Sequence, residues 1–367
     1  MMKIVLFFII NFILLIGCDS KSINIIEEGV GFTLDTIVFD IPANCLSYYT
    51  GVEIDNETNK LWFYNHQLNS FDIFSLTTKL YDTTIYLEKK GPRGIPNGVE
   101  DFYVKNNQIF VSSGLFASKF DINYNNFENY MISYNDSANF STAGGLILAD
   151  LNSPSIYDFD KNHLFQRLYP LHNNRIDNPF IVSVDLNTMK YEVINKIIYP
   201  EYIAKNGKYY DQLANPNFIL SNGKFIVNFP FCNNIYEYNK NGKMKTYTIN
   251  TALEVKPRKR DPSMSQVDAF KNVYSSSKYL PIIFDPYKKF YYRFQCTEKK
   301  MGEVNSSRDY SMSVINESFK HLGEISLPAG ILVEDVLISK HGCIFQIKSS
   351  IPSDINYLKL LILDVTI

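Results

Sequence analysis

Two pairs of acidic residues in this 367-residue sequence occupy matching positions in a repeated pattern. Glu100-Asp101 and Glu334-Asp335 each open an apolar run that is followed by a polar turn and a second apolar run. If both pairs lie on strands that line a common channel, one acid of each could face it, where together they would hold a cation or a basic ligand. The same acids could instead accept hydrogen bonds from backbone amides of a neighbouring unit. The sequence leaves both interpretations open.

Arginine is the other side chain whose placement suggests binding chemistry, because its planar guanidinium can bind a carboxylate or phosphate through two hydrogen bonds. Arginine is scarce, with 7 residues against 29 lysines. Arg93, Arg175 and Arg293 lie nearest to predicted turns or strand ends, and Asp285 opens a predicted turn. The alternative role for each arginine is an ion pair at the surface or between repeat units. We retain these four residues as ligand-binding candidates beside the acidic pairs.

The sequence carries none of the compact motifs that mark common enzyme classes. It lacks the Gly-x-Ser-x-Gly turn, the Walker loop, the His-Glu-x-x-His motif and the dinucleotide-binding glycine pattern. We therefore predict no catalytic residue and no cofactor, and no motif supports a divalent cation. The alternative is a metal-dependent hydrolase of the lactonase type, or a carbohydrate-active enzyme, with the acidic pairs as metal ligands.

The first residues have the layout of a bacterial lipoprotein signal. After Lys3, an apolar run of 13 residues from Ile4 to Ile16 is followed by Gly17 and Cys18. This run is shorter than the ~20 residues that span a bilayer as a helix, which favours a cleaved signal peptide over a retained helix. We predict cleavage before Cys18, lipidation of that cysteine and anchoring to the bacterial cell envelope.

The remaining cysteines and the net charge limit the classes of protein to which this chain can belong. Four cysteines allow three disulfide pairings in an oxidising envelope, but each lies in an apolar, strand-like stretch, so buried free thiols are the alternative. These four are Cys45, Cys232, Cys296 and Cys343. With a formal net charge of −2, the chain has no basic field for binding nucleic acid. We expect a monomer without a nucleic-acid partner.

Hairpins repeated along the chain would position these candidates. Short apolar runs bounded by Asn, Asp, Gly and Lys recur throughout, and six turns between such runs have a mean spacing of 57 residues. The six turns are Asn56-Glu57, Asn106-Asn107, Lys161-Asn162, Asn222-Gly223, Tyr287-Lys288 and His341-Gly342. A second hairpin follows in most units. Four antiparallel strands per unit and six units predict an all-β fold, a six-bladed β-propeller.

The predicted ring needs one further strand to close. The sixth unit ends one strand short, and Phe32–Asp40 has the alternation and length to supply the missing outer strand. An open sandwich of irregular strands is the alternative, but it does not explain why six units fill the chain. We predict a signal peptide over residues 1–17, a tether over 18–29 and a single propeller domain over 30–367.

Two turns carry a resemblance to a known group of proteins. The segment Phe284–Phe294, with Asp-Pro-Tyr followed by Tyr-Tyr-Arg, and the turn Gly91–Gly94 resemble uncharacterised lipoproteins from Bacteroidetes-type bacteria. That group is catalogued only as a domain of unknown function and is similar to TolB-like six-bladed β-propellers. The resemblance implies a Gram-negative envelope, with the outer membrane as the expected location and its periplasmic or surface face undetermined. Asp136-Ser137-Ala138 is similar to sites that such bacteria O-glycosylate, so Ser137 is a glycosylation candidate.

A propeller binds ligands through the loops on one face and the mouth of its central channel. We therefore predict a non-catalytic binding or scaffold protein that docks a protein, a peptide or a glycan on its loop face.

Overall fold

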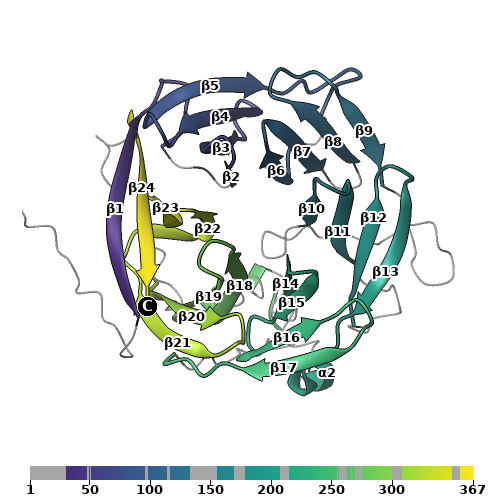
Figure 1. Cartoon of the computed structure of the whole chain (residues 1–367), viewed down its shortest axis with the longest axis vertical. Helices are drawn as coiled ribbons and strands as arrows, with labels where there is room; N and C mark the ends of the chain where they lie inside the picture. The colour runs from purple at the N-terminus through teal and green to yellow at the C-terminus, as the bar shows by residue number, and fades with distance from the viewer. Residues whose placement is uncertain are drawn as a thin grey trace, which may run out of the picture.

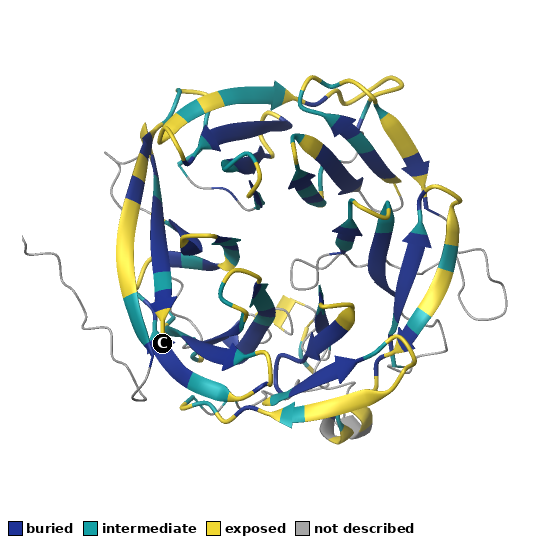
Figure 2. Cartoon of the chain, in the orientation of Figure 1, coloured by how far each residue is buried: buried dark blue, intermediate teal, exposed yellow. Residues whose placement is uncertain are grey.

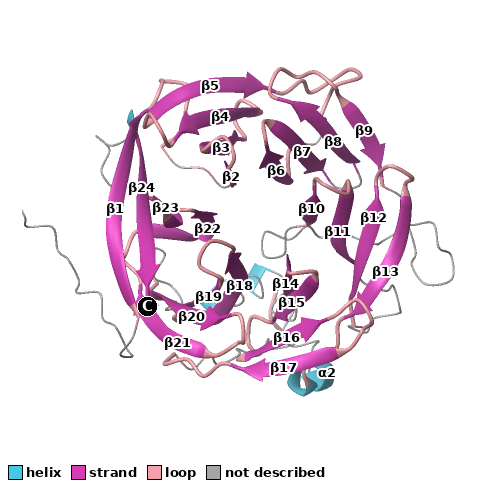
Figure 3. Ribbon diagram, viewed as in Figure 1, coloured by secondary structure: helices cyan, strands magenta, loops and turns pink. Residues whose placement is uncertain are grey.

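The chain folds into six four-stranded antiparallel sheets arranged as the blades of a closed ring (Figure 1). Figure 3 shows that strands make up almost all the regular structure. The predicted six-bladed β-propeller is therefore confirmed. The computed structural model describes residues 30–47, 49, 51–95, 98–113, 116–132, 155–168, 178–206, 215–253, 255, 263–265, 267–268, 271, 275–299, 308–348 and 356–367.

The blades follow one another in chain order. Blade 1 contains β2 (Val52–Asp55), β3 (Lys60–Asn65), β4 (Ser70–Ser75) and β5 (Leu80–Tyr86). Blade 2 contains β6 (Asp101–Lys105), β7 (Gln108–Ser113), β8 (Phe116–Asp121) and β9 (Glu128–Met131). Blade 3 contains β10 (Ile156–Asp158), β11 (His163–Leu168), β12 (Phe180–Asp185) and β13 (Lys190–Lys196).

The second half of the ring has the same plan. A short helix, α2 (Glu201–Asn206), lies in the connection from blade 3 to blade 4. Blade 4 contains β14 (Asn217–Ser221), β15 (Lys224–Asn228), β16 (Asn234–Tyr238) and β17 (Met244–Thr248). Blade 5 contains β18 (Lys278–Asp285), β19 (Phe290–Cys296), β20 (Tyr310–Asn316) and β21 (His321–Ser326). Blade 6 contains β22 (Ile331–Ser339), β23 (Gly342–Ile347), β24 (Tyr357–Thr366) and, outermost, β1 (Gly31–Asp40).

The antiparallel order gives the ring two different faces. Turns between the first and second strands, and between the third and fourth strands, lie on one face, which we call the turn face; all six predicted turns lie there. Connections between the second and third strands, and from one blade to the next, lie on the opposite face, the loop face. The described ends of the connection from β17 to β18, residues 249–253 and 275–277, lie at the loop face.

Local chemistry explains why the turns form where they do. Asn106 and Asn107 both adopt left-handed backbone angles, with φ of 55° and 60°, which is the conformation a two-residue hairpin turn requires. At the end of β18, Asp285 accepts hydrogen bonds from the backbone amides of Tyr287 (2.9 Å) and Lys288 (3.0 Å). Asp285 thus fixes a turn, which is a structural role for one of the predicted ligand-binding residues.

The first strand closes the ring, as predicted. β1 pairs with β24 in an antiparallel register of ten residue pairs, from Gly31 opposite Thr366 to Asp40 opposite Tyr357. A second link joins the same two ends of the ring, because the side-chain amide of Gln346 donates to the Tyr49 carbonyl (2.8 Å) and accepts from the Tyr49 amide (2.9 Å).

Apolar side chains fill the space between neighbouring blades. Phe63 and Phe74 of blade 1 pack in one cluster with Leu360 of blade 6, and comparable clusters join the other blades. Figure 2 shows exposed residues concentrated on the outer strands and buried ones on the middle strands. The four cysteines that the structure describes are free thiols, three of them buried. In the described part of the chain, no helix has the length and apolar character needed to cross a bilayer.

Candidate functional site

Asp101 lies on the innermost strand of blade 2, as predicted, and contacts the next blade. Its carboxylate accepts hydrogen bonds from the hydroxyls of Tyr103 (2.8 Å) and Ser155 (2.9 Å), and Ser155 immediately precedes β10 of blade 3. Burial raises the pKa of Asp101 to about 6 despite these hydrogen bonds. Its partner Glu100 lies just before β6 and is exposed. Asp101 therefore joins two blades, in line with the structural interpretation of the acidic pairs.

Glu53, which the sequence analysis missed, is the electrostatic neighbour of Asp101. It lies on β2, the innermost strand of blade 1, beside β6 of blade 2. Burial, and then the negative charge of Asp101, raise the pKa of Glu53 to about 8. A carboxyl group that keeps its proton near pH 7 can donate a hydrogen bond, so this pair offers both a donor and acceptors beside the ring axis.

Glu334 and Asp335 lie on the innermost strand of blade 6 and match Glu100 and Asp101 in distance from the following turn. The pairing of β22 with β23 shifts register between Leu332 and Leu337, so both acids sit in an irregular stretch of the strand. Burial, and then Glu334, raise the pKa of Asp335 to about 7. Over the described ranges, no three His, Cys, Asp or Glu side chains are grouped so as to hold a metal ion.

The remaining candidates differ widely in position. Arg93 is exposed, and its guanidinium donates to the Tyr124 carbonyl (3.0 Å), which ties the connection after blade 1 to a turn of blade 2. The alternative considered for this arginine was an ion pair between units; the observed contact does link two units, but through a hydrogen bond to a backbone carbonyl. Arg175, Ser137 and Cys18 lie outside the described residues.

Arg293 breaks the pattern of its own repeat. It is the fourth residue of β19, the second strand of blade 5, and it is fully buried. The fourth residues of the other second strands, none of them charged, are Phe63, Val111, Gln166, Val227 and Phe345. A charged residue at a position that the other blades fill with mostly apolar side chains indicates a structural or functional role that those blades lack.

The contacts of Arg293 lead to the loop face. Its guanidinium donates to the backbone carbonyls of Asn233 (3.0 Å) and Cys232, in the loop-face connection between β15 and β16 of blade 4. The guanidinium carbon also lies 3.6 Å from the centre of the Tyr279 ring, near the start of β18. Arg293 thus fixes two segments of neighbouring blades relative to each other through charge-assisted hydrogen bonds and a cation–π contact.

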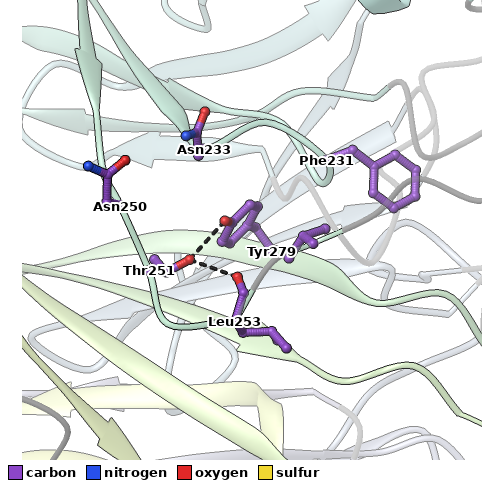
Figure 4. A pocket seen from close by; sticks show the side chains of 7 residues that line it. Phe231, Asn233, Asn250, Thr251, Leu253 and Tyr279 are labelled. Carbon is purple, nitrogen blue, oxygen red and sulfur yellow. Dashed lines mark hydrogen bonds between the residues drawn. The ribbon is translucent and has the colours of Figure 1, made fainter.

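Those two segments form part of a pocket on the loop face, between blades 4 and 5 (Figure 4). Its volume is about 240 Å³. The lining comes from three stretches of chain and consists of Phe231, Asn233, Asn250, Thr251, Leu253, Val255 and Tyr279. None of these side chains is ionisable near neutral pH, so the pocket is suited to a neutral group with both polar and apolar surface.

Hydrogen bonds use up some polar groups of the pocket and leave others available. The Thr251 hydroxyl donates to the Leu253 carbonyl (2.9 Å), so the Tyr279 hydroxyl donates to Thr251 (2.9 Å), as Figure 4 shows. The side-chain amides of Asn233 and Asn250 are exposed and make no hydrogen bond to any residue that the structure describes. Each amide offers two donors and one acceptor oxygen to a ligand.

A buried polar layer holds the rim of the pocket in place. Glu324 on β21 is buried and accepts hydrogen bonds from the Ser311 hydroxyl (2.7 Å), from the Gln295 amide and from the backbone amide of Ala252 (3.0 Å). Because Ala252 follows Thr251, this layer positions the pocket-lining stretch before any ligand binds. Preorganisation of this kind lowers the entropy cost of binding.

The acids beside the ring axis predict how stability depends on pH. The pKa values of Glu53, Asp101 and Asp335 are all raised by the fold, so the native state holds protons that the unfolded chain releases. We expect the free energy of unfolding to fall as pH rises from about 4.5 to about 8. Glu53→Gln should reduce this pH-dependent loss in the free energy of unfolding by roughly 3 kcal/mol, a value that allows for the partial exposure of the Glu53 carboxyl.

Urea unfolding at several pH values measures the effect of Glu53→Gln. The matched control is Glu57→Gln, an exposed glutamate in the turn that follows β2, which should leave the pH dependence unchanged. A pH dependence that survives Glu53→Gln intact would contradict the assignment.

Sequence reasoning missed the pocket residues because no single motif contains them. The sequence pointed to this region only through Arg293, a scarce arginine near a predicted turn. A signal for Glu53 did exist, because the turn at Asn56 places this acid on an innermost strand.

Comparisons with known proteins agree with the fold. Residues 22–326 match the family described as Domain of unknown function (DUF4221). The crystal structure of a DUF4221 member from Bacteroides vulgatus superimposes with a TM-score of 0.72 at 17% identity, covering 92% of this chain and 98% of that one. A putative exported protein from Bacteroides fragilis gives 0.54 at 11% identity, covering 92% and 96%. Likenesses at these identities show the fold alone. No curated protein matches the sequence.

Proposed function

This chain belongs to the DUF4221 family, whose function is unknown, and we propose that it is an envelope-anchored propeller that binds a ligand at the pocket between blades 4 and 5. The ligand is part of a protein, a peptide or a glycan. The protein acts by binding and scaffolding, and it does so without a cofactor.

One observation carries this proposal: in the part of the chain that the structure describes, the loop-face pocket has apolar walls, no charged side chain and two asparagine amides that make no hydrogen bond. Amide side chains can pair with sugar hydroxyls or with the peptide backbone, both of which are neutral donors and acceptors. The buried Arg293 beneath Tyr279 supports the same assignment, because it holds the pocket walls at a position where other blades carry no charge.

The anchor is the second part of the proposal. The apolar run before Cys18 and the small Gly17 support cleavage and lipidation at that cysteine. A lipid at the start of the mature chain would hold the propeller at a membrane, with the outer membrane as the expected location.

Ligand capture tests the binding function. The mature chain carrying Cys18→Ser would be immobilised and exposed to envelope extracts, a peptide array and a glycan array. We expect the domain to capture a ligand, and Asn233→Ala with Asn250→Ala to reduce capture because two hydrogen-bonding amides are lost. The matched control is Asn123→Ala with Asn241→Ala, two exposed asparagines on the turn face.

Two results would contradict the proposal. One is capture that is reduced equally by the turn-face control. The other is a domain that captures nothing while it turns over members of a glycan or lactone panel, which would make it an enzyme.

A further inference from the structure

We infer that the turn face of this propeller lies against an anionic lipid surface, which leaves the pocket on the loop face directed away from the membrane. The inference rests on the lipid anchor proposed above, and three observations carry it: where the described chain starts, how far a tether can reach, and how charge is distributed over the turn face.

The described chain starts on the turn face. Val30 is buried, and Gly31 lies opposite Thr366 at the end of β24. That end of β24 is on the turn face, because Lys288, in the turn between β18 and β19, forms an ion pair with Asp364. A tether from Cys18 therefore reaches the propeller at this face.

The predicted tether between the lipid anchor and β1 is short. Twelve residues precede Val30 when counted from Cys18. As a flexible chain they would have an end-to-end distance of about 20 Å, and about 40 Å if fully extended. Figure 1, viewed down the shortest axis of the molecule, shows β1 running along the rim of the ring beside β24. A tether of this length keeps the start of β1, and with it the adjoining turn face, close to the membrane.

The charge of the turn face favours an anionic surface. Seven exposed lysines on its turns and adjoining strand ends make no ion pair within the described residues, against three such exposed acids, Glu57, Glu128 and Glu317. The seven are Lys79, Lys190, Lys240, Lys243, Lys289, Lys320 and Lys340. They come from blades 1, 3, 4, 5 and 6, so the positive charge is spread around the ring. Lysines at a membrane surface are attracted by anionic headgroups within about one Debye length.

Vesicle sedimentation tests the inference separately from lipidation. The mature chain carrying Cys18→Ser would be mixed at low salt with vesicles of phosphatidylcholine containing 30% phosphatidylglycerol, or of phosphatidylcholine alone. We expect binding to the anionic vesicles only, and its loss at high salt. Lys240→Gln, Lys289→Gln and Lys340→Gln together should weaken this binding roughly 100-fold.

The matched control replaces three exposed lysines in or beside loop-face connections, Lys196, Lys271 and Lys348, by glutamine, and should bind within about twofold of the unchanged chain. Equal binding to both kinds of vesicle, no binding to either, or an equal loss in the control would overturn the inference. Lipidation is scored in cells by comparing detergent-phase partitioning of the unchanged chain and Cys18→Ser, so its failure is seen independently.

Discussion

Deleting residues 18–41 is expected to lower the melting temperature of the mature chain by at least about 10 °C, or to make it aggregate. The deletion removes β1 and with it ten residue pairs of the ladder to β24. It also removes the buried side chains of Ile37 and Phe39, each worth about 1.5–3 kcal/mol. The exposed edge of β24 would then be free to pair with other chains. Differential scanning calorimetry measures the change.

The control for this deletion is the removal of residues 19–29, which leaves β1 in place. This shorter variant should melt like the full mature chain. If both truncated variants melted at the same temperature, β1 would contribute nothing to the stability of the ring. That result would contradict closure of the ring by β1.

Arg293→Ala should destabilise the propeller by about 3 kcal/mol. The substitution leaves the Cys232 carbonyl without its guanidinium donor, removes the contact with the Tyr279 ring and opens a cavity between blades 4 and 5. Arg293→Met keeps most of the side-chain volume, so it should recover part of the loss through packing. Urea denaturation of the three proteins measures these differences.

Arg93→Ala is the matched control for Arg293→Ala. Both arginines donate to a backbone carbonyl, but Arg93 is exposed, so its loss should cost less than about 1 kcal/mol. Equal effects of the two substitutions would show that burial of Arg293 is not what makes it important.

The strand order could be predicted from the sequence because its signals are local. Turns such as Asn106-Asn107 and Asn222-Gly223 require left-handed backbone angles that Asn and Gly adopt readily, and each is flanked by apolar runs. Counting these turns gave the number of blades, and the unpaired sixth unit gave the role of β1.

The site could be predicted only in part because its residues are assembled from distant stretches. Asn233, Asn250 and Tyr279 come from three segments that only the contact between blades 4 and 5 brings together. Arg293 was predicted because arginine is scarce and this residue lies near a predicted turn, but its contacts with the connection between β15 and β16 could not be predicted from the sequence. The same difference applies to the acidic residues. Asp101 was predicted because Asp335 occupies the matching position in another unit, whereas its neighbour Glu53 has no acidic counterpart in another blade.

The most direct test of the binding site is a calorimetric titration of the captured ligand into three proteins. We predict that Asn233→Ala with Asn250→Ala raises the dissociation constant by about 10- to 100-fold, because each lost hydrogen bond is worth about 1 kcal/mol. Asn123→Ala with Asn241→Ala should bind like the unchanged chain. An unchanged dissociation constant for the pocket variant would contradict a binding site between blades 4 and 5.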